Sequence, residues 1–383
     1  MPKVLLFHGG GPTAVLNASL AGAISTFQEK GWQVYASPFG IAKLLDHDPV
    51  PVPLLGRNET QMLVRSPGSA IGSGRDHLED QDYVRLAQRL ISLGFSAVSG
   101  AGGNGTMDTV QKLSKACSRY GITVTGIPKT MDNDLSITDH SPGFLSAALY
   151  MAASVREVLY DIHSLPIHVV VIEAFGRNAG WITASSALAG DDDVKGPDLI
   201  LPPEIPFDED AFLSGVEEAY SRKGGVCVVA SEGLKYGDGK PVVEPVFKTD
   251  RSVYFGDVSA KLSQLVTQKL NIKSRSEKPG LLSRASIAWQ SRRDAEEAFQ
   301  CGRISAMAAC SGRSGEMSII IREGEKPYAA RVEMKPIGKD ILSERTLPAS
   351  YISREDFCMT DEFFNYMNPL FDAEKPGSFM TFV

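Results

Sequence analysis

The residues best suited to chemistry stand together in one segment, Pro128–Asp134, which reads PKTMDND. Two carboxylates, Asp132 and Asp134, lie two positions apart, and Lys129 and Thr130 come just before them. Phosphoryl transfer needs such a set, because a cation stabilises the moving charge, one acid accepts a hydroxyl proton and carboxylates hold Mg²⁺. The alternative is a solvated turn rich in Asp and Asn. The added lysine and threonine favour phosphoryl-transfer chemistry.

Two glycine-rich turns have the composition of anion sites. Gly9–Thr13 (GGGPT) and Gly100–Thr106 (GAGGNGT) each follow an apolar run and precede a helical pattern. Backbone N–H groups in such a turn, with the positive end of the following helix, bind anions. The first turn is not a GxGxxG fingerprint, and GxxxxGK[ST] does not occur in the chain. A glycine at such a turn can be required by backbone geometry alone. Two such turns together are therefore a more specific indication of an anion site than either turn by itself.

A further polar segment follows the apolar run Val169–Ile172. It is Glu173–Trp181, which reads EAFGRNAGW. The guanidinium of Arg177 is suited to bridging phosphate oxygens, because its planar fork matches two acceptors at once. The segment therefore adds a second cation to the predicted phosphoryl-transfer site.

Taken in order along the chain, these motifs resemble those of the 6-phosphofructokinases, a family of ATP- or pyrophosphate-dependent sugar-phosphate kinases. The match runs from Gly9 to about Arg303 and includes GGGPTAVLN (Gly9–Asn17), SAIGSGR (Ser69–Arg75), GGNGT (Gly102–Thr106), PKTMDND, FGRNAGW (Phe175–Trp181), Pro203-Glu204 and PGLLSRAS (Pro279–Ser286). NAD and lipid kinases have a similar GGDGT loop, but they lack the PKTMDND and FGRNAGW elements.

The resemblance implies a role for each matching residue. Asp132 is expected to be the general base, and the catalytic set is Asp132, Thr130, Arg177 and Lys129. The phosphoryl donor is expected to bind Gly11, Arg75, Gly103, Asn104, Gly105 and Thr106. The acceptor is expected to bind Thr130, Asp132, Phe175, Gly176, Arg177, Glu232, Arg275 and Arg284, with one of the last two arginines reaching across a subunit interface. Mg²⁺ is the implied cofactor, with Asn104 and Asp134 as its protein ligands.

Three positions depart from the family's pattern. Asn104 replaces the aspartate of the usual GGD loop, which weakens metal contact there. His168 stands where many members have a third phosphate-binding arginine, and Leu281 stands where a histidine or tyrosine commonly faces the sugar. These departures leave the identity of the acceptor open.

Two positions bear on the donor. Gly105 matches most ATP-dependent members, whereas most pyrophosphate-dependent members have aspartate there, whose carboxylate would repel the α-phosphate of ATP. Lys129 points the other way, because pyrophosphate-dependent members use this lysine to stabilise the leaving phosphate. We give the space that Gly105 leaves for the α-phosphate more weight than the cation of Lys129, because a lysine there does not exclude ATP. The sequence therefore favours ATP.

The leading hypothesis is a glycolytic enzyme that transfers a phosphoryl group from Mg-ATP to the 1-hydroxyl of fructose 6-phosphate, giving fructose 1,6-bisphosphate. The same-class alternatives are a reversible pyrophosphate-dependent phosphofructokinase and a kinase of another sugar phosphate or polyol. A different class, a catalytically silent phosphosugar-sensing subunit, is suggested by Asn104. The intact segment Lys129–Asp134 argues against it, because a sensor needs no general base.

Short apolar strands that alternate with amphipathic helices must position these motifs. This pattern predicts an α/β fold with two Rossmann-like parallel-sheet domains, helices on both faces and the active site in the cleft between them. We expect a donor-binding domain over residues 1–143 and about 285–312, and a sugar-phosphate-binding domain over 144–284 and about 313–383. From about residue 330 the sequence indicates an irregular, aromatic tail that packs across the domains.

Composition agrees with a globular enzyme of two to three domains: 383 residues, 43% hydrophobic and 22% charged. A net charge of −7 argues against a nucleic-acid partner, and no apolar run approaches the roughly 20 residues of a membrane span. Five cysteines without a CxxC pair favour the reducing cytoplasm. The resemblance implies a homodimer or homotetramer.

Overall fold

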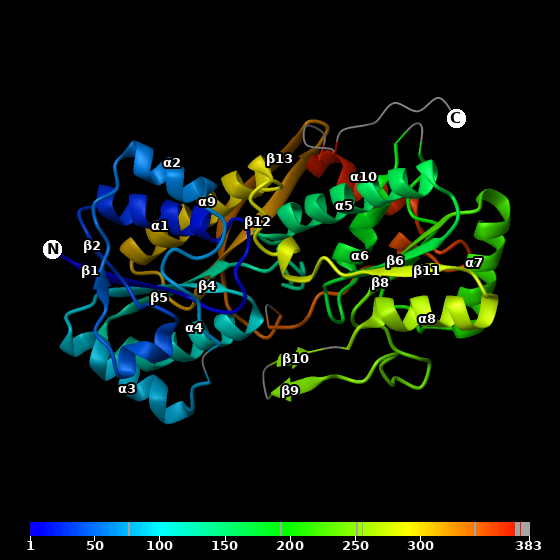
Figure 1. The fold of residues 1–383 in the computed structure, drawn as a ribbon. Coiled ribbons are helices and arrows are strands. Elements are labelled where there is room, and N and C mark those ends of the chain that lie inside the picture. The colour runs from blue at the N-terminus through cyan, green and yellow to red at the C-terminus, as the bar shows by residue number, and fades with distance from the viewer. Residues whose placement is uncertain are drawn as a thin grey trace. The chain divides into compact units, whose positions relative to one another are not determined.

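A computed structural model describes residues 1–75, 77–191, 194–249, 252–254, 256–340, 342–371 and 376. The chain forms two compact units (Figure 1). Unit 1 comprises Met1–Ser146 and Arg284–Arg345, and unit 2 comprises Ala147–Ser283 and Thr346–Val383. No helix among the described residues is long and apolar enough to cross a membrane.

Unit 1 contains a seven-stranded sheet of order β13-β12-β5-β4-β1-β2-β3. The five inner strands are parallel, and the edge strands β13 and β3 are antiparallel to their neighbours. The strands are β1 (Lys3–His8), β2 (Gln33–Ala36), β3 (Val50–Pro51), β4 (Ala97–Gly102), β5 (Thr123–Pro128), β12 (Glu316–Glu325) and β13 (Tyr328–Pro336). The helices are α1 (Leu16–Glu29), α2 (Arg57–Arg65), α3 (Asp80–Ser92), α4 (Asn104–Cys117) and α9 (Arg292–Cys310), with short 3₁₀ turns η1 (Ile41–Leu45) and η2 (Ser118–Tyr120).

Strand β1 shows why the central strands of this unit are apolar throughout. Val4 and Leu6 belong to one core cluster with residues of α1 and α9, whereas Leu5 and Phe7 belong to another with residues of α3 and α4. Successive side chains of a strand point to opposite faces, so a sheet covered by helices on both faces needs apolar residues at every position. Figure 1 shows the two helix pairs on opposite sides of the sheet.

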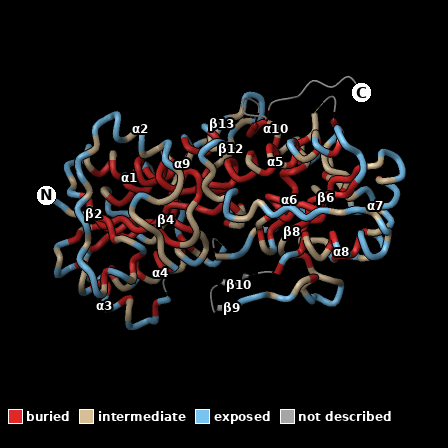
Figure 2. The backbone as a smooth tube through the Cα atoms, in the orientation of Figure 1, coloured by how far each residue is buried: buried red, intermediate tan, exposed pale blue. Residues whose placement is uncertain are grey.

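Unit 2 contains a four-stranded parallel sheet of order β11-β6-β8-β7. Its strands are β6 (Val169–Ala174), β7 (Leu199–Leu201), β8 (Val226–Ser231) and β11 (Ser274–Glu277), and two small hairpins pair β9 (Phe247–Thr249) with β10 (Ser252–Tyr254) and β14 (Ile352–Ser353) with β15 (Cys358–Met359). Its helices are α6 (Trp181–Ser185), α7 (Glu209–Lys223), α8 (Val258–Leu270) and α10 (Asp361–Phe371), with 3₁₀ turns η3 (Ser186–Ala189), η4 (Gly280–Ser283) and η5 (Ala349–Tyr351). Strands β6 and β8 are buried along their whole length (Figure 2). The long helix α5 (Phe144–Ser164) begins in unit 1 and continues into unit 2.

The C-terminal third differs from the sequence-based expectation in two ways. Residues 313–345 were expected in the second domain, but they belong to unit 1, because β12 pairs with β5 and β13 pairs with β12. The aromatic tail is not irregular throughout, since it contains β13 and α10. Within unit 2, the rings of Tyr351 and Tyr366 lie 6.1 and 5.6 Å from that of Trp181.

A buried charged cluster holds β12 and β13 of unit 1 against α9. His140 Nδ1 bonds to Asp139 (2.8 Å) and Nε2 to Glu297 (2.6 Å), while Arg322 pairs with Asp139 and Tyr328 donates to Glu297. Burial alone would lower the pKa of His140, but Glu297 and Asp139 outweigh it and raise this pKa to about 9. The buried imidazolium therefore neutralises two partly buried carboxylates.

Replacing His140 with glutamine should lower the free energy of unfolding at pH 6 by roughly 1.5–3 kcal/mol, because it removes the cation hydrogen-bonded to two partly buried carboxylates. The folded-state pKa of about 9 lies above the ordinary 6.5, so the contribution of His140 is complete below pH 6.5 and is lost as pH rises through 9. Urea unfolding across this range should therefore show the variant and the wild type converging at high pH. The exposed His47→Gln is the control, and equal losses at pH 6 and pH 10 would contradict the assignment.

Candidate active site

Three of the predicted segments meet at one edge of the unit 1 sheet. Strands β1, β4 and β5 are parallel neighbours, so their carboxyl ends lie side by side. The Gly9 N–H donates to the Ala101 carbonyl (2.8 Å), and the Lys129 N–H donates to the Gly102 carbonyl (3.0 Å). The structure thus brings together the GGGPT turn, the GGNGT turn and the PKTMDND segment.

Two glycines permit the close approach of the first turn of α4 to these strand ends. A Cβ on Gly9 would stand 2.2 Å from Thr106 Oγ1, and one on Gly102 would stand 2.1 Å from the same atom. Thr106 therefore packs between the two glycine turns. Helix α4 starts at Asn104 directly beside them, and its positive end favours an anion at this edge.

Lys129 is the buried cation of the site. Its side chain is enclosed, and Nζ donates to the Gly11 carbonyl at 2.7 Å. Burial, with smaller contributions from Arg284 and Arg75, lowers the pKa of Lys129 to about 8, against the opposing effect of Asp132 and Asp134. The amine is therefore a cation near neutral pH that loses its charge unusually easily.

A tight turn sets the positions of the two carboxylates. The Asp132 N–H donates to Thr130 Oγ1 (3.1 Å), and the Thr130 N–H donates to the Pro142 carbonyl (3.2 Å). Between the carboxylates stands Asn133, which is fully buried, has a φ of 54° and accepts from the Ser141 N–H at 3.0 Å. Non-glycine residues rarely adopt this conformation, so the contacts around Asn133 must hold it.

The residues predicted to hold Mg²⁺ lie together and fit the ion. Asn104 Nδ2 reaches the Asp134 carbonyl at 3.4 Å, and the buried oxygens Asn104 Oδ1 and Asp134 Oδ1 have no hydrogen-bond partner among the described residues. Mg²⁺ is commonly held by one or two carboxylates plus substrate phosphates and water rather than by a cage of protein ligands. The described part of the chain contains no group of three or more His, Cys, Asp or Glu placed for a metal.

Two of the predicted arginines, Arg75 and Arg284, belong to unit 1 and lie near the turn Gly9–Thr13. Gly10 donates to the Gly74 carbonyl (2.8 Å) and so places the segment that carries Arg75 beside the turn. Arg284 was expected at the acceptor's phosphate, and the structure places its guanidinium against Gly11, 3.7 Å from where a Cβ would stand. Both raise the positive charge around Lys129.

In unit 2 the structure brings together four of the predicted acceptor residues. Phe175, Gly176 and Arg177 follow β6, and Glu232 follows the neighbouring strand β8. The Gly176 N–H points at Glu232 Oε1 (3.4 Å), and Arg177 has a φ of 52°. A Cβ on Gly233 would stand 1.6 Å from the Arg177 carbonyl, so glycine is required where the two loops touch.

Sequence reasoning missed Lys278 in this region. Its Nζ lies 2.7 Å from Glu173, whose side chain is 2% exposed, and the negative charge of Glu232 also acts on it. Burial raises the pKa of Glu173, and Lys278 opposes this. The signal was present, because a buried glutamate near the end of an otherwise apolar strand needs a cationic or hydrogen-bonding partner.

Arg275 and His168 lie elsewhere in unit 2. Arg275 is exposed on β11, opposite Val170 of β6. Val170 lies five positions before Phe175, a distance of about 16 Å along a strand. Beside Arg275, His168 is buried, and neither of its ring nitrogens has a hydrogen-bond partner among the residues that the structure describes. Its Nε2 lies 3.7 Å from the Asp161 carboxylate. Burial lowers the pKa of His168, helped by Arg275 and Lys273. Leu281 is 70% exposed.

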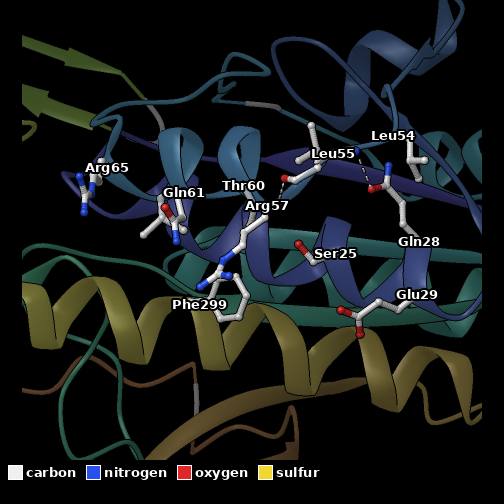
Figure 3. A pocket seen from close by; sticks show the side chains of 12 residues that line it. Ser25, Gln28, Glu29, Leu54, Leu55, Arg57, Thr60, Gln61, Arg65 and Phe299 are labelled. Carbon is white, nitrogen blue, oxygen red and sulfur yellow. Dashed lines mark hydrogen bonds between the residues drawn. The ribbon is translucent and has the colours of Figure 1, made fainter.

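A pocket of about 790 Å³ lies in unit 1 away from these residues (Figure 3). It is lined by α1, α2, α9 and the segment before α2, with Gln28 Oε1 accepting from the Leu55 N–H at 3.1 Å. Its lining residues include none of the predicted site residues: they are Ser25, Gln28, Glu29, Leu54, Leu55, Gly56, Arg57, Thr60, Gln61, Val64, Arg65 and Phe299.

Comparison with known proteins extends the likeness over the whole chain. The pyrophosphate–fructose 6-phosphate 1-phosphotransferase of Xanthomonas campestris is 34% identical and covers 98% of this chain and 92% of that protein. The sulfofructose kinase of Alkalicoccus urumqiensis is 33% identical and covers 91% and 92%. The solved pyrophosphate-dependent phosphofructokinase of Nitrosospira multiformis is 32% identical, with a TM-score of 0.88 over 99% of this chain and 94% of that one.

A family model matches most of the chain. The model described as phosphofructokinase spans residues 3–309, which include all the predicted site residues. The two glycine turns, the carboxylate segment and the Arg177 loop all lie within this span. On this match the chain belongs to the phosphofructokinase family.

Proposed function

We propose that the protein is a pyrophosphate-dependent phosphofructokinase, which transfers a phosphoryl group between pyrophosphate and the 1-hydroxyl of fructose 6-phosphate. The observation that carries the choice of donor is Lys129, a buried cation hydrogen-bonded to the glycine turn. A fixed cation at this place suits a leaving group as compact and as charged as inorganic phosphate.

The comparisons favour pyrophosphate over ATP, against the preference drawn from Gly105. Four relatives that are 31–34% identical over nearly the whole chain are named pyrophosphate–fructose 6-phosphate 1-phosphotransferases. The steric argument was weak for a physical reason. A Cβ on Gly105 would meet nothing within 4 Å, so the space there admits a larger donor without requiring one.

In this proposal each residue has one task. Asp132 takes the proton of the acceptor's 1-hydroxyl, while Thr130 holds the loop in which Asp132 lies. Lys129 and Arg177 stabilise the charge on the transferring and leaving phosphates. Asn104 and Asp134 would hold Mg²⁺, which supplies charge neutralisation on the donor's phosphates.

The donor is tested by turnover of fructose 6-phosphate with Mg²⁺ and either pyrophosphate or ATP. We expect activity with pyrophosphate to exceed that with ATP. Gly105→Asp should abolish any residual use of ATP and retain pyrophosphate activity, because the added carboxylate has room and repels an α-phosphate. A wild-type enzyme active with ATP and inactive with pyrophosphate would overturn this choice of donor.

Arg275 lies away from Phe175 and Arg177 of its own chain, so we propose that it reaches the acceptor's phosphate across a subunit interface. Replacing it with alanine should then raise KM for fructose 6-phosphate about tenfold or more, because one charge-assisted hydrogen bond contributes roughly 1.5–3 kcal/mol. The value of kcat should change less. Arg284→Ala should raise KM for the acceptor by a similar factor. It should also raise KM for the donor, because Arg284 lies against Gly11. The exposed Arg222→Ala is the control. If neither variant alters the acceptor's KM, the acceptor is not a phosphosugar held by these residues.

A second acceptor, sulfofructose, is favoured by one relative and one residue. The sulfofructose kinase of Alkalicoccus urumqiensis aligns over 91% of this chain. His168 is buried beside Asp161 and Arg275. A histidine carries less positive charge there than the arginine that many family members have, so this position suits a singly charged sulfonate better than a phosphate. Comparing kcat/KM for fructose 6-phosphate and sulfofructose decides between the two, and we expect the phosphate to be preferred.

A further inference from the structure

One short stretch of chain is hydrogen-bonded to loops in both units. The chain leaves unit 1 for the last time at Arg345 and continues in unit 2 from Thr346. We define the connecting segment as residues 343–347. In unit 1 it contacts the loop that carries Asp132, and in unit 2 it contacts Glu204, which is hydrogen-bonded to the loop that carries Arg177.

In unit 1 the connecting segment runs along the residues that follow the catalytic carboxylates. The Arg345 N–H donates to the Asp134 carbonyl at 2.9 Å, and Glu344 forms an antiparallel bridge with Leu135. The Ser136 hydroxyl donates to the Ser343 carbonyl at 2.6 Å. The segment therefore acts as a short extra strand against the carboxylate loop.

The side chain of Arg345 extends this contact further along the loop. One guanidinium nitrogen, Nη1, donates to the Thr138 carbonyl at 3.0 Å and also to the Asp139 carbonyl. This stretch lacks regular secondary structure, and Ile137 has a φ of 60°. Residues in that conformation persist only where surrounding contacts hold them, and the arginine holds the two residues that follow Ile137.

In unit 2 the connecting segment meets Glu204. Its Oε1 accepts from the Leu347 N–H at 2.7 Å and from the Gly180 N–H at 2.8 Å. Gly180 lies three positions after Arg177 and precedes α6. A Cβ on Gly180 would stand 2.4 Å from Glu204 Oε2, so glycine permits the carboxylate to approach the loop. One carboxylate thus joins the connecting segment to the Arg177 loop.

We propose that Arg345 and Glu204 are positioning residues for phosphoryl transfer. Arg345 holds the loop of Asp132 and Asp134, and Glu204 holds the loop of Arg177 through the same connecting segment. The inference rests on the proposed function, since it assigns these loops to one reaction. Neither residue needs to touch a substrate for this role.

The test uses the full-length enzyme and pairs of variants at each position. Arg345→Met removes the donor and should lower kcat at least tenfold, with KM for both substrates within about twofold of wild type. Arg345→Lys should keep kcat within about threefold, because a single nitrogen reaches both carbonyls and an ammonium also donates several hydrogen bonds. Arg331→Met, which removes an exposed arginine on β13, is the matched control and should leave kcat unchanged.

Glu204 is tested in the same way. Glu204→Ala should lower kcat at least tenfold, whereas Glu204→Gln, whose amide oxygen still accepts both N–H groups, should remain within threefold. Because the two residues act through one segment, the double variant Arg345→Met/Glu204→Ala should lose less activity than the product of the single losses.

The possible outcomes separate the two proposals. If the wild type does not phosphorylate fructose 6-phosphate with either donor, the proposed function fails. If the wild type is active and Arg345→Met or Glu204→Ala lowers the melting temperature without lowering the kcat of the folded enzyme, the residues are merely structural and the inference is overturned. If the double variant loses kcat by the product of the two single losses, the two residues act independently, and the claim that they act through one segment is overturned.

Discussion

Replacing Asp132 with serine should lower kcat at least about 100-fold, because a positioned general base contributes roughly 10²–10⁴-fold. In the proposed mechanism the Asp132 carboxylate receives the proton of the acceptor hydroxyl as the new O–P bond forms. Serine cannot accept that proton, but its N–H still donates to Thr130 Oγ1, so the turn that shapes the loop remains. KM for the donor should therefore change little.

The measurement is steady-state turnover in both directions of the reaction, with melting temperature as a check on folding. Asp108→Ser is a suitable control, because Asp108 pairs only with the exposed Lys112 at the next turn of α4 among the ion pairs described. A serine variant that keeps more than a tenth of wild-type kcat would show that Asp132 is not the base.

Replacing Lys129 with methionine should lower kcat with pyrophosphate by about 10²–10³-fold, the size of effect known for a preorganised charge-stabilising group. Methionine fills a similar volume but has no charge and no donor for the Gly11 carbonyl. The loss should be smaller with ATP, whose leaving group is not inorganic phosphate. Lys112→Met on the surface of α4 is the control.

The pH profile gives an independent signature of Lys129. Burial lowers the pKa of this amine to about 8, so the free wild-type enzyme loses the cation as pH rises through that value. The value of kcat/KM with pyrophosphate, which reports the free enzyme, should fall above pH 8. The Lys129→Met variant should lack this alkaline decline, and an unchanged decline would assign it to another group.

Local pattern determined much of the donor side of the site. The PKTMDND segment and both glycine turns follow apolar runs, and in a parallel α/β sheet such runs end at one edge. The contacts of Gly9 with Ala101 and of Lys129 with Gly102 therefore follow from features that each span only a few residues. The same reasoning placed Phe175 and Arg177 after an apolar run, whereas Glu232 came from the family resemblance, and the structure shows that the strands preceding them, β6 and β8, are neighbours.

Strand β11 (SRSE) shows where local pattern stops being informative. It is polar because it lies on the edge of its sheet and is largely exposed, so it lacks the apolar run by which β6 could be recognised. Residues 313–345 were placed in the wrong domain for a related reason. The pairing of β12 with β5 joins residues nearly 200 positions apart, and no periodicity within either segment encodes it.

The sequence by itself determined the family resemblance, the two-sheet α/β class and which side chains are proposed to react, because these depend on short motifs and on the alternation of strands and helices. Only the tertiary structure decided which distant residues support them. Arg345 reaches the Asp134 loop and Lys278 reaches Glu173 across gaps of more than 100 positions, and the lowered pKa of Lys129 comes from burial. Burial and long-range contact are properties of the folded chain, since they depend on what surrounds a residue in space rather than along the sequence.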